Sequence, residues 1–114
     1  MIELAANLAG NAYSKSLDEV RKLQKDFIKT YLHFLEFAIA SPEDVKEAEV
    51  YKFEVGLGGT YQMLIKNTVG REKERYQEQY GIIKELNKVL MERLNKNKAK
   101  LIRLIEDLEN SLKT

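Results

Sequence analysis

Cysteine and tryptophan are absent from the 114-residue chain, and histidine and proline occur only once each. Without cysteine there can be no disulfide framework, no thiolate zinc site and no cysteine nucleophile. The single histidine, His33, leaves little material for acid–base or metal chemistry. The lack of cysteine also agrees with a reducing compartment. We therefore expect a protein that is not an enzyme and that uses no cofactor and no metal.

Long apolar runs and an excess of one charge sign are also missing. The chain has nineteen basic and eighteen acidic residues, and its mean hydropathy is −0.44. No segment approaches the roughly 20 apolar residues that span a bilayer, and residues 1–13 lack the pattern of a signal peptide. The basic segment 84–103 has no interleaved aromatic residues to stack on bases. We expect a cytoplasmic protein that binds neither nucleic acid nor membranes.

The clearest pattern lies in the C-terminal half, where apolar residues recur at gaps of three and four, which is typical of one face of a helix. Thr68 can cap its start. At 1.5 Å per residue, a helix over about 68–112 would be ~65 Å long and would need an equally long partner. Asn87 and Asn97 interrupt the apolar face, where we expect them to lower stability but fix register. The apolar positions are Val69, Tyr76, Tyr80, Ile83, Leu90, Leu94, Leu101, Leu104, Leu108 and Leu112.

The N-terminal third supplies a candidate partner helix. A broad apolar stripe runs from Leu17 to Ala38, and Ser16 with Glu19 forms a capping-box pattern at its start. Upstream, apolar residues in segment 2–12 keep helical spacing around a glycine. The sequence therefore predicts a helix over about 2–40, with a start at Ser16 as the alternative.

The middle of the chain departs from helical spacing. Ser41, Pro42 and the acidic residues after them predict that one helix ends and the next begins here. We therefore interpret residues 41–49 as a connector. In 50–55 apolar and charged residues alternate, three glycines follow within 56–59, and 61–66 can return as a second strand. We predict a β-hairpin over about 50–66. The alternative is a single helix over 42–112.

The segment around this predicted hairpin resembles a known family. Residues 48–52, Ala-Glu-Val-Tyr-Lys, followed by Val55-Gly56, are similar to the first hairpin strand of β-type prefoldin subunits. Residues 55–61 also resemble the glycine-rich hairpin of α-type subunits. The resemblance implies one mostly α domain over 1–114. In this domain a long antiparallel two-helix coiled coil carries a central β-hairpin used for oligomerisation.

The resemblance also implies a function. Prefoldin subunits are ATP-independent molecular chaperones that hold unfolded proteins at coiled-coil tips and deliver them to a chaperonin. The implied partners are other prefoldin-type subunits in a homo- or hetero-oligomer, unfolded client proteins and a chaperonin. An isolated hairpin is marginal in water, so its apolar residues should be buried between subunits. These oligomerisation residues are Tyr51, Phe53, Val55, Tyr61, Met63 and Ile65. The implied client-binding residues at the tip are Ile2, Leu4, Leu8, Leu104, Leu108 and Leu112.

Two other interpretations stay open at this point. If residues 42–112 form one helix, the chain resembles a helical coiled-coil component of a bacterial flagellar or type III export apparatus. A designed or viral helical hairpin without a client is the third reading.

Overall fold

The computed structural model describes residues 16–92 and 98–113, and these ranges are almost entirely helical. A short 3-10 helix, η1 (Pro42–Asp44), joins the first two of four α-helices. The four are α2 (Leu17–Ala40), α3 (Glu47–Asn67), α4 (Gly70–Met91) and α5 (Lys98–Lys113).

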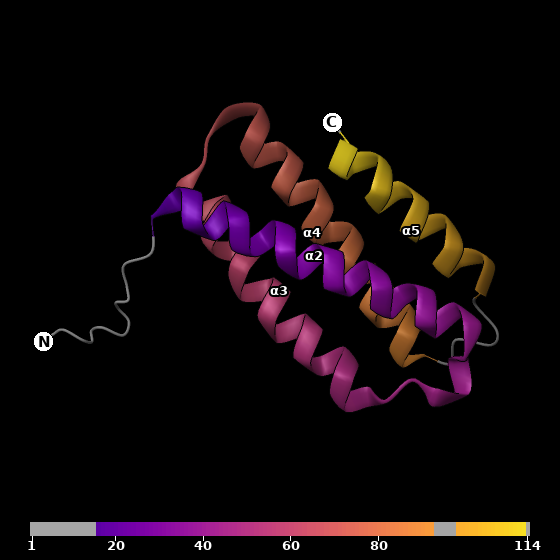
Figure 1. The fold of residues 1–114 in the computed structure, drawn as a ribbon. Coiled ribbons are helices and arrows are strands. Elements are labelled where there is room, and N and C mark those ends of the chain that lie inside the picture. The colour runs from indigo at the N-terminus through magenta and orange to yellow at the C-terminus, as the bar shows by residue number, and fades with distance from the viewer. Residues whose placement is uncertain (1–15, 93–97, 114) are drawn as a thin grey trace, which may run out of the picture.

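The four helices form an up-and-down bundle. In Figure 1 each helix runs antiparallel to the one before it in the chain. Helix α2 packs on α3, α3 on α4 and α4 on α5, and α5 returns to contact α2. The beginning of α2 and the end of α5 therefore lie at the same end of the bundle (Figure 1). This closed ring buries the apolar stripe of each helix against two neighbours.

Helix α2 begins as its sequence predicts. The Ser16 side chain accepts a hydrogen bond from the Glu19 backbone N–H at 3.2 Å, and the Ser16 N–H donates to Glu19 Oε1 at 2.9 Å. This reciprocal capping box is confirmed. The predicted extension of the helix over residues 2–15 lies outside the described residues.

The predicted β-hairpin is wrong. Residues 47–67 form the unbroken helix α3, and no strand occurs in the described ranges. The alternation of apolar and charged residues in 50–55 suggested a strand, in which every second side chain is buried. The side chains that are buried in the structure follow helical spacing instead. Burial against two neighbouring helices outweighs the β-propensity of single residues, which depends strongly on context. The fully buried α3 residues are Val50, Leu57, Tyr61 and Leu64.

Two glycines that suggested a turn serve helix packing instead. A Cβ added at Gly56 would overlap the ring of Phe27 on α2, and one added at Gly58 would lie 3.3 Å from the Tyr80 hydroxyl on α4. Each glycine costs α3 about 1 kcal/mol relative to alanine. The close packing of α2 and α4 on α3 offsets this cost, since an added Cβ would displace the Phe27 ring at Gly56 and shift the Tyr80 hydroxyl at Gly58.

The predicted long helix over 68–112 and the alternative helix over 42–112 are both wrong. The chain reverses between α3 and α4, where Gly70 has φ 64°, a left-handed conformation that glycine adopts readily. The Thr68 hydroxyl donates to the Leu64 carbonyl at 2.7 Å just before this reversal. Helix α4 ends at Met91, and α5 begins at Lys98. Instead of a two-helix coiled coil, the apolar stripe therefore folds back on itself.

Candidate interaction surface

A chain of polar side chains crosses the core and links all four helices. Gln24 of α2 donates through Nε2 to the Tyr61 hydroxyl on α3 at 2.8 Å. That hydroxyl donates to Oε1 of Gln79 on α4, also at 2.8 Å. Gln79 Nε2 then donates to the carbonyl oxygen of Ser111 on α5 at 3.3 Å. Burial raises the pKa of Tyr61 well above its usual range, so the hydroxyl keeps the proton that it donates.

A second buried polar pair lies further along the core. The Tyr31 hydroxyl on α2 donates to Oδ1 of Asn87 on α4 at 2.6 Å. Burial also raises the Tyr31 pKa. Asn87 was predicted to fix register, and the structure buries it in the core, whereas Asn97 lies outside the described residues. The Asn87 Nδ2 atom is buried and has no hydrogen-bond partner among the described residues.

We expect the double variant Tyr31→Phe/Asn87→Leu to be more stable than the wild type by about 1–2 kcal/mol, because it removes the unpaired amide and both buried polar groups. Tyr31→Phe alone should lower stability by a similar amount, since it leaves Asn87 Oδ1 without its donor. Urea unfolding of both variants measures the difference. A double variant less stable than Tyr31→Phe would contradict the expected energetics of this pair.

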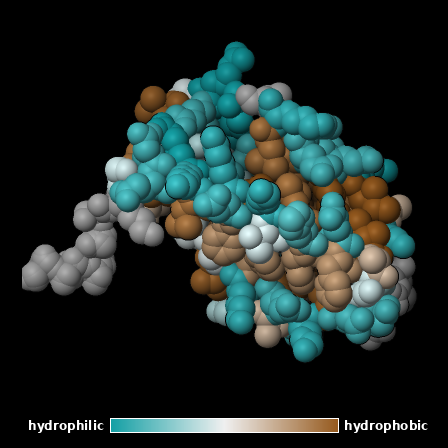
Figure 2. Space-filling model, viewed as in Figure 1, coloured by the Kyte–Doolittle hydropathy of each residue, from teal (hydrophilic) through white to brown (hydrophobic). Residues whose placement is uncertain are grey.

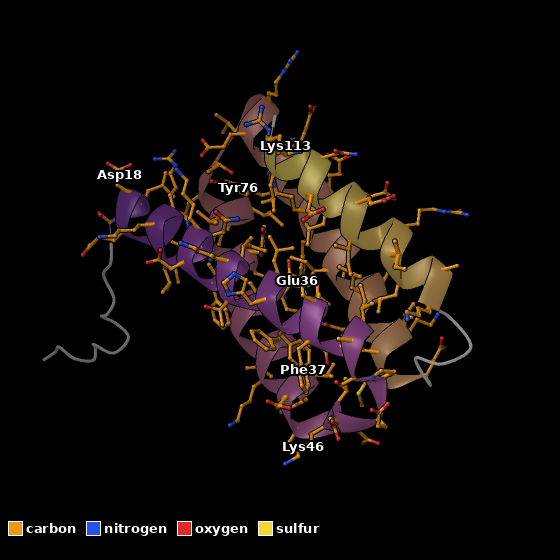
Figure 3. The ribbon with its side chains drawn as sticks, turned by 45° about the vertical axis from the view of Figure 1, so that its right-hand side comes forward. Asp18, Glu36, Phe37, Lys46, Tyr76 and Lys113 are labelled. Carbon is orange, nitrogen blue, oxygen red and sulfur yellow. The ribbon has the colours of Figure 1, made fainter. Side chains whose placement is uncertain are left out.

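A cluster of charged side chains lies at the end of the bundle where α2 begins. Arg21 donates through Nε to Glu72 at 2.7 Å and through Nη2 to the same carboxylate at 3.0 Å. It also pairs with Asp18 at 2.8 Å. The hydrogen bonds from Arg21 hold the pKa of Glu72 below its usual range. In Figure 3, Asp18, Tyr76 and Lys113 lie at this end and Lys46 lies at the other. The cluster aligns α2 with α4.

The structure divides the six predicted oligomerisation residues into two groups. Phe53, Tyr61 and Ile65 are buried or half-buried within the bundle, and the Phe53 ring packs on Tyr31 at 5.2 Å between centroids. The other three lie on the outer side of α3. Their exposed fractions are 64% for Tyr51, 56% for Val55 and 48% for Met63.

These exposed residues belong to one row on the surface of α3. Tyr51, Val55, Gly59 and Met63 follow one another at intervals of four and form the α3 stripe. A Cβ added at Gly59 would meet nothing within 4 Å, so the row has a gap at this position. A shallow α2/α3 groove borders the stripe at its C-terminal end. Its lining residues are Leu17, Val20, Gly59, Gln62, Met63, Lys66 and Asn67.

Other apolar residues also reach the surface. On the face shown in Figure 2, apolar side chains appear between the helices, while polar side chains cover most of the remainder. Phe37 of α2 is 43% exposed and Val69 between α3 and α4 is 83% exposed. The α3 stripe differs from these positions because three large apolar side chains and an open glycine follow one another along a single helix.

The three predicted client-binding residues that the structure describes, Leu104, Leu108 and Leu112, do not form an exposed tip. Leu108 is fully buried in the core, and Leu104 and Leu112 are half-buried against it. Ile2, Leu4 and Leu8 lie outside the described residues. These three leucines of α5 thus contribute to the bundle core, as Leu101 does.

Sequence reasoning missed three members of the buried polar chain, Gln24, Gln79 and Ser111, whereas it predicted that Tyr61 is buried, although between subunits. Gln24 lies one turn from Val20 and one turn from Ile28, so its place in an apolar row was the available signal. Gln79 lies three residues after Tyr76 and four before Ile83, and Ser111 lies three residues after Leu108. Both therefore share a helix face with apolar residues, which is the same kind of signal. His33, which we did not expect to bind a metal ion, is exposed on α2.

The described residues hold no group of three or more histidine, aspartate or glutamate side chains placed to bind a metal ion. Within the same ranges, no helix has the length and apolar character needed to cross a membrane. A scan against protein-family models and searches of curated proteins and solved structures found no match to this chain.

Proposed function

We propose that this chain is a protein-interaction module that binds a helical partner through the α3 stripe. The exposure of three large apolar side chains in one row carries the proposal. Tyrosine and methionine are enriched at the centres of protein interfaces, and an i, i+4 row is the ridge that helices use to pack together. The open position at Gly59 allows a partner backbone or side chain to approach closely.

The proposal keeps one part of the chaperone interpretation, an apolar surface that covers another protein. Assembly through a hairpin platform is not included, because residues 50–66 are helical. The bundle core supplies the rigidity that such a surface needs. Buried hydrogen bonds join α3 to α2 and α4, so the stripe is held on a fixed framework.

Site-specific photo-cross-linking tests the proposal. A photo-reactive phenylalanine analogue at Tyr51 should form protein adducts in cells that express the chain, and the same analogue at Gln77, exposed on α4, should not. Adducts at Tyr51 should disappear when Val55→Glu is added, because the carboxylate would be buried against the partner. Equal adducts at both positions, or none at Tyr51, would exclude the α3 stripe as a binding surface.

A further inference from the structure

We infer that the partner of the α3 stripe is a second copy of this chain, docked so that the two α3 helices run antiparallel in a symmetric dimer. This inference rests on the proposed function and adds the identity and the direction of the partner. Three features of the stripe support it: the spacing of its residues, the difference between its two ends, and the charges beside each end.

The spacing suits close helix–helix contact. Rows of residues at intervals of four interdigitate when two helices cross at about −50°, the commonest packing class. In a symmetric antiparallel pair centred between Val55 and Gly59, Val55 of each copy meets Gly59 of the other. The side chain that projects from one helix enters the gap in the other, and the symmetry produces this contact twice.

The two ends of the stripe have complementary shapes. Tyr51 projects from one end with 64% of its surface exposed. The α2/α3 groove, which includes Met63 and Leu17, lies beside the other end. Antiparallel docking places Tyr51 of each copy at the groove of the other, where the ring can contact the Met63 sulfur. Parallel docking would place the two tyrosines together and leave both grooves empty.

The charges next to the stripe favour the same direction. Glu47 lies one turn before Tyr51, and Lys66 lines the groove at the opposite end. An antiparallel pair brings Glu47 of each copy toward Lys66 of the other. A parallel pair would place like charges side by side at both ends, which is unfavourable.

The contact should be weak and dependent on concentration. One pair of crossing helices buries less than the roughly 1,600 Å² of a standard interface. Small interfaces also leave little free energy after the cost of association, so a dissociation constant in the micromolar range, about 1–100 μM, is expected.

Sedimentation velocity across this concentration range tests the dimer. The wild-type chain should change from the mass of one chain, 13.2 kDa, to twice that value as concentration rises. Val55→Glu should remain at the mass of one chain throughout, with unchanged helical circular dichroism. The matched control Gln77→Glu adds the same charge to α4 and should dimerise as the wild type does.

Disulfide formation tests the direction, because the native chain has no cysteine. A mixture of Tyr51→Cys and Met63→Cys chains should form the mixed disulfide far more readily than either chain pairs with itself. Preferential self-pairing would indicate a parallel dimer and overturn the inference. A ready intramolecular disulfide in a Leu8→Cys/Met63→Cys chain would place the N-terminal segment in the groove and also overturn it.

The two proposals fail separately. A wild-type chain that stays monomeric yet forms cross-links from Tyr51 to another protein would overturn the dimer and leave the interaction module intact. A chain without adducts at Tyr51 would exclude both.

Discussion

Gly56→Leu is expected to lower the free energy of unfolding by about 3 kcal/mol relative to Gly81→Leu. At Gly56 even the Cβ atom would overlap the Phe27 ring of α2, so a leucine must displace the ring or separate the helices. At Gly81 a Cβ meets nothing within 4 Å, and leucine should raise stability through its better helix propensity. Urea unfolding of both variants, with helical content checked by circular dichroism, measures the difference.

A second substitution makes this prediction specific. Phe27→Ala in the Gly56→Leu background opens space for the new side chain and should restore part of the lost stability. The single variant Phe27→Ala should be destabilising, because it removes a ring that packs on Phe53 at 6.0 Å between centroids. Additive effects of the two substitutions would show that they are not in contact, and α2 would then not approach α3 at Gly56.

Tyr61→Phe is expected to lower the free energy of unfolding by about 3 kcal/mol, although it removes a single oxygen atom. The change leaves the Gln24 amide and the Gln79 carbonyl oxygen buried without their partner, and each unpaired group costs about 1–3 kcal/mol. Denaturant unfolding measures the loss. The matched control is Tyr80→Phe, since the Tyr80 hydroxyl accepts a bond from the exposed Gln62 and water can replace it. The control should change stability by less than about 1 kcal/mol.

The cause of this loss can be separated from a simple change in packing. Gln24→Met and Gln79→Met replace the two side chains that each hold an unpaired group with apolar side chains of similar shape. Added to Tyr61→Phe, they should recover most of the lost stability. If the triple variant is as unstable as Tyr61→Phe alone, the buried hydrogen bonds are not the cause. If Tyr80→Phe is equally destabilising, the effect does not depend on burial.

The start of α2 could be predicted because its signals are local. The capping box needs only Ser16 and Glu19, three residues apart, and its apolar stripe repeats over six turns. Such features form within one segment and do not depend on which other segment packs beside it. The prediction that Asn87 lies on the apolar face of its helix also rested on local spacing alone.

The hairpin prediction was wrong because the same local run of glycines is compatible with two different structures. Glycine clusters permit turns, but they also permit close packing of helices. Which one applies at Gly56 depends on Phe27, which is 29 positions earlier in the chain. The continuous apolar stripe after residue 68 also led to a wrong prediction, that of one long helix. Two helices that fold back on each other and one long helix both need apolar residues at the same spacing.

The candidate site was partly visible in the sequence. Tyr51, Val55 and Met63 were predicted to lie between subunits because they are apolar residues on one face of a hairpin. The structure places them on one face of a helix instead, and it encloses Phe53, Tyr61 and Ile65 in the same chain. Residues four positions apart lie on the same side of a strand, and they lie on approximately the same side of a helix. The exposed three therefore share a face under either fold.

By itself, the sequence determined the helical segment after Ser16, the lack of cysteine chemistry and the positions of the apolar residues. The tertiary structure alone decided that four shorter helices form a closed bundle, and that one row on α3 remains outside it. The physical reason is that spacing within a segment specifies only which side chains can be buried together. The neighbours available at Gly56, Tyr61 and Gly70 decide where the chain turns and which apolar face is left exposed.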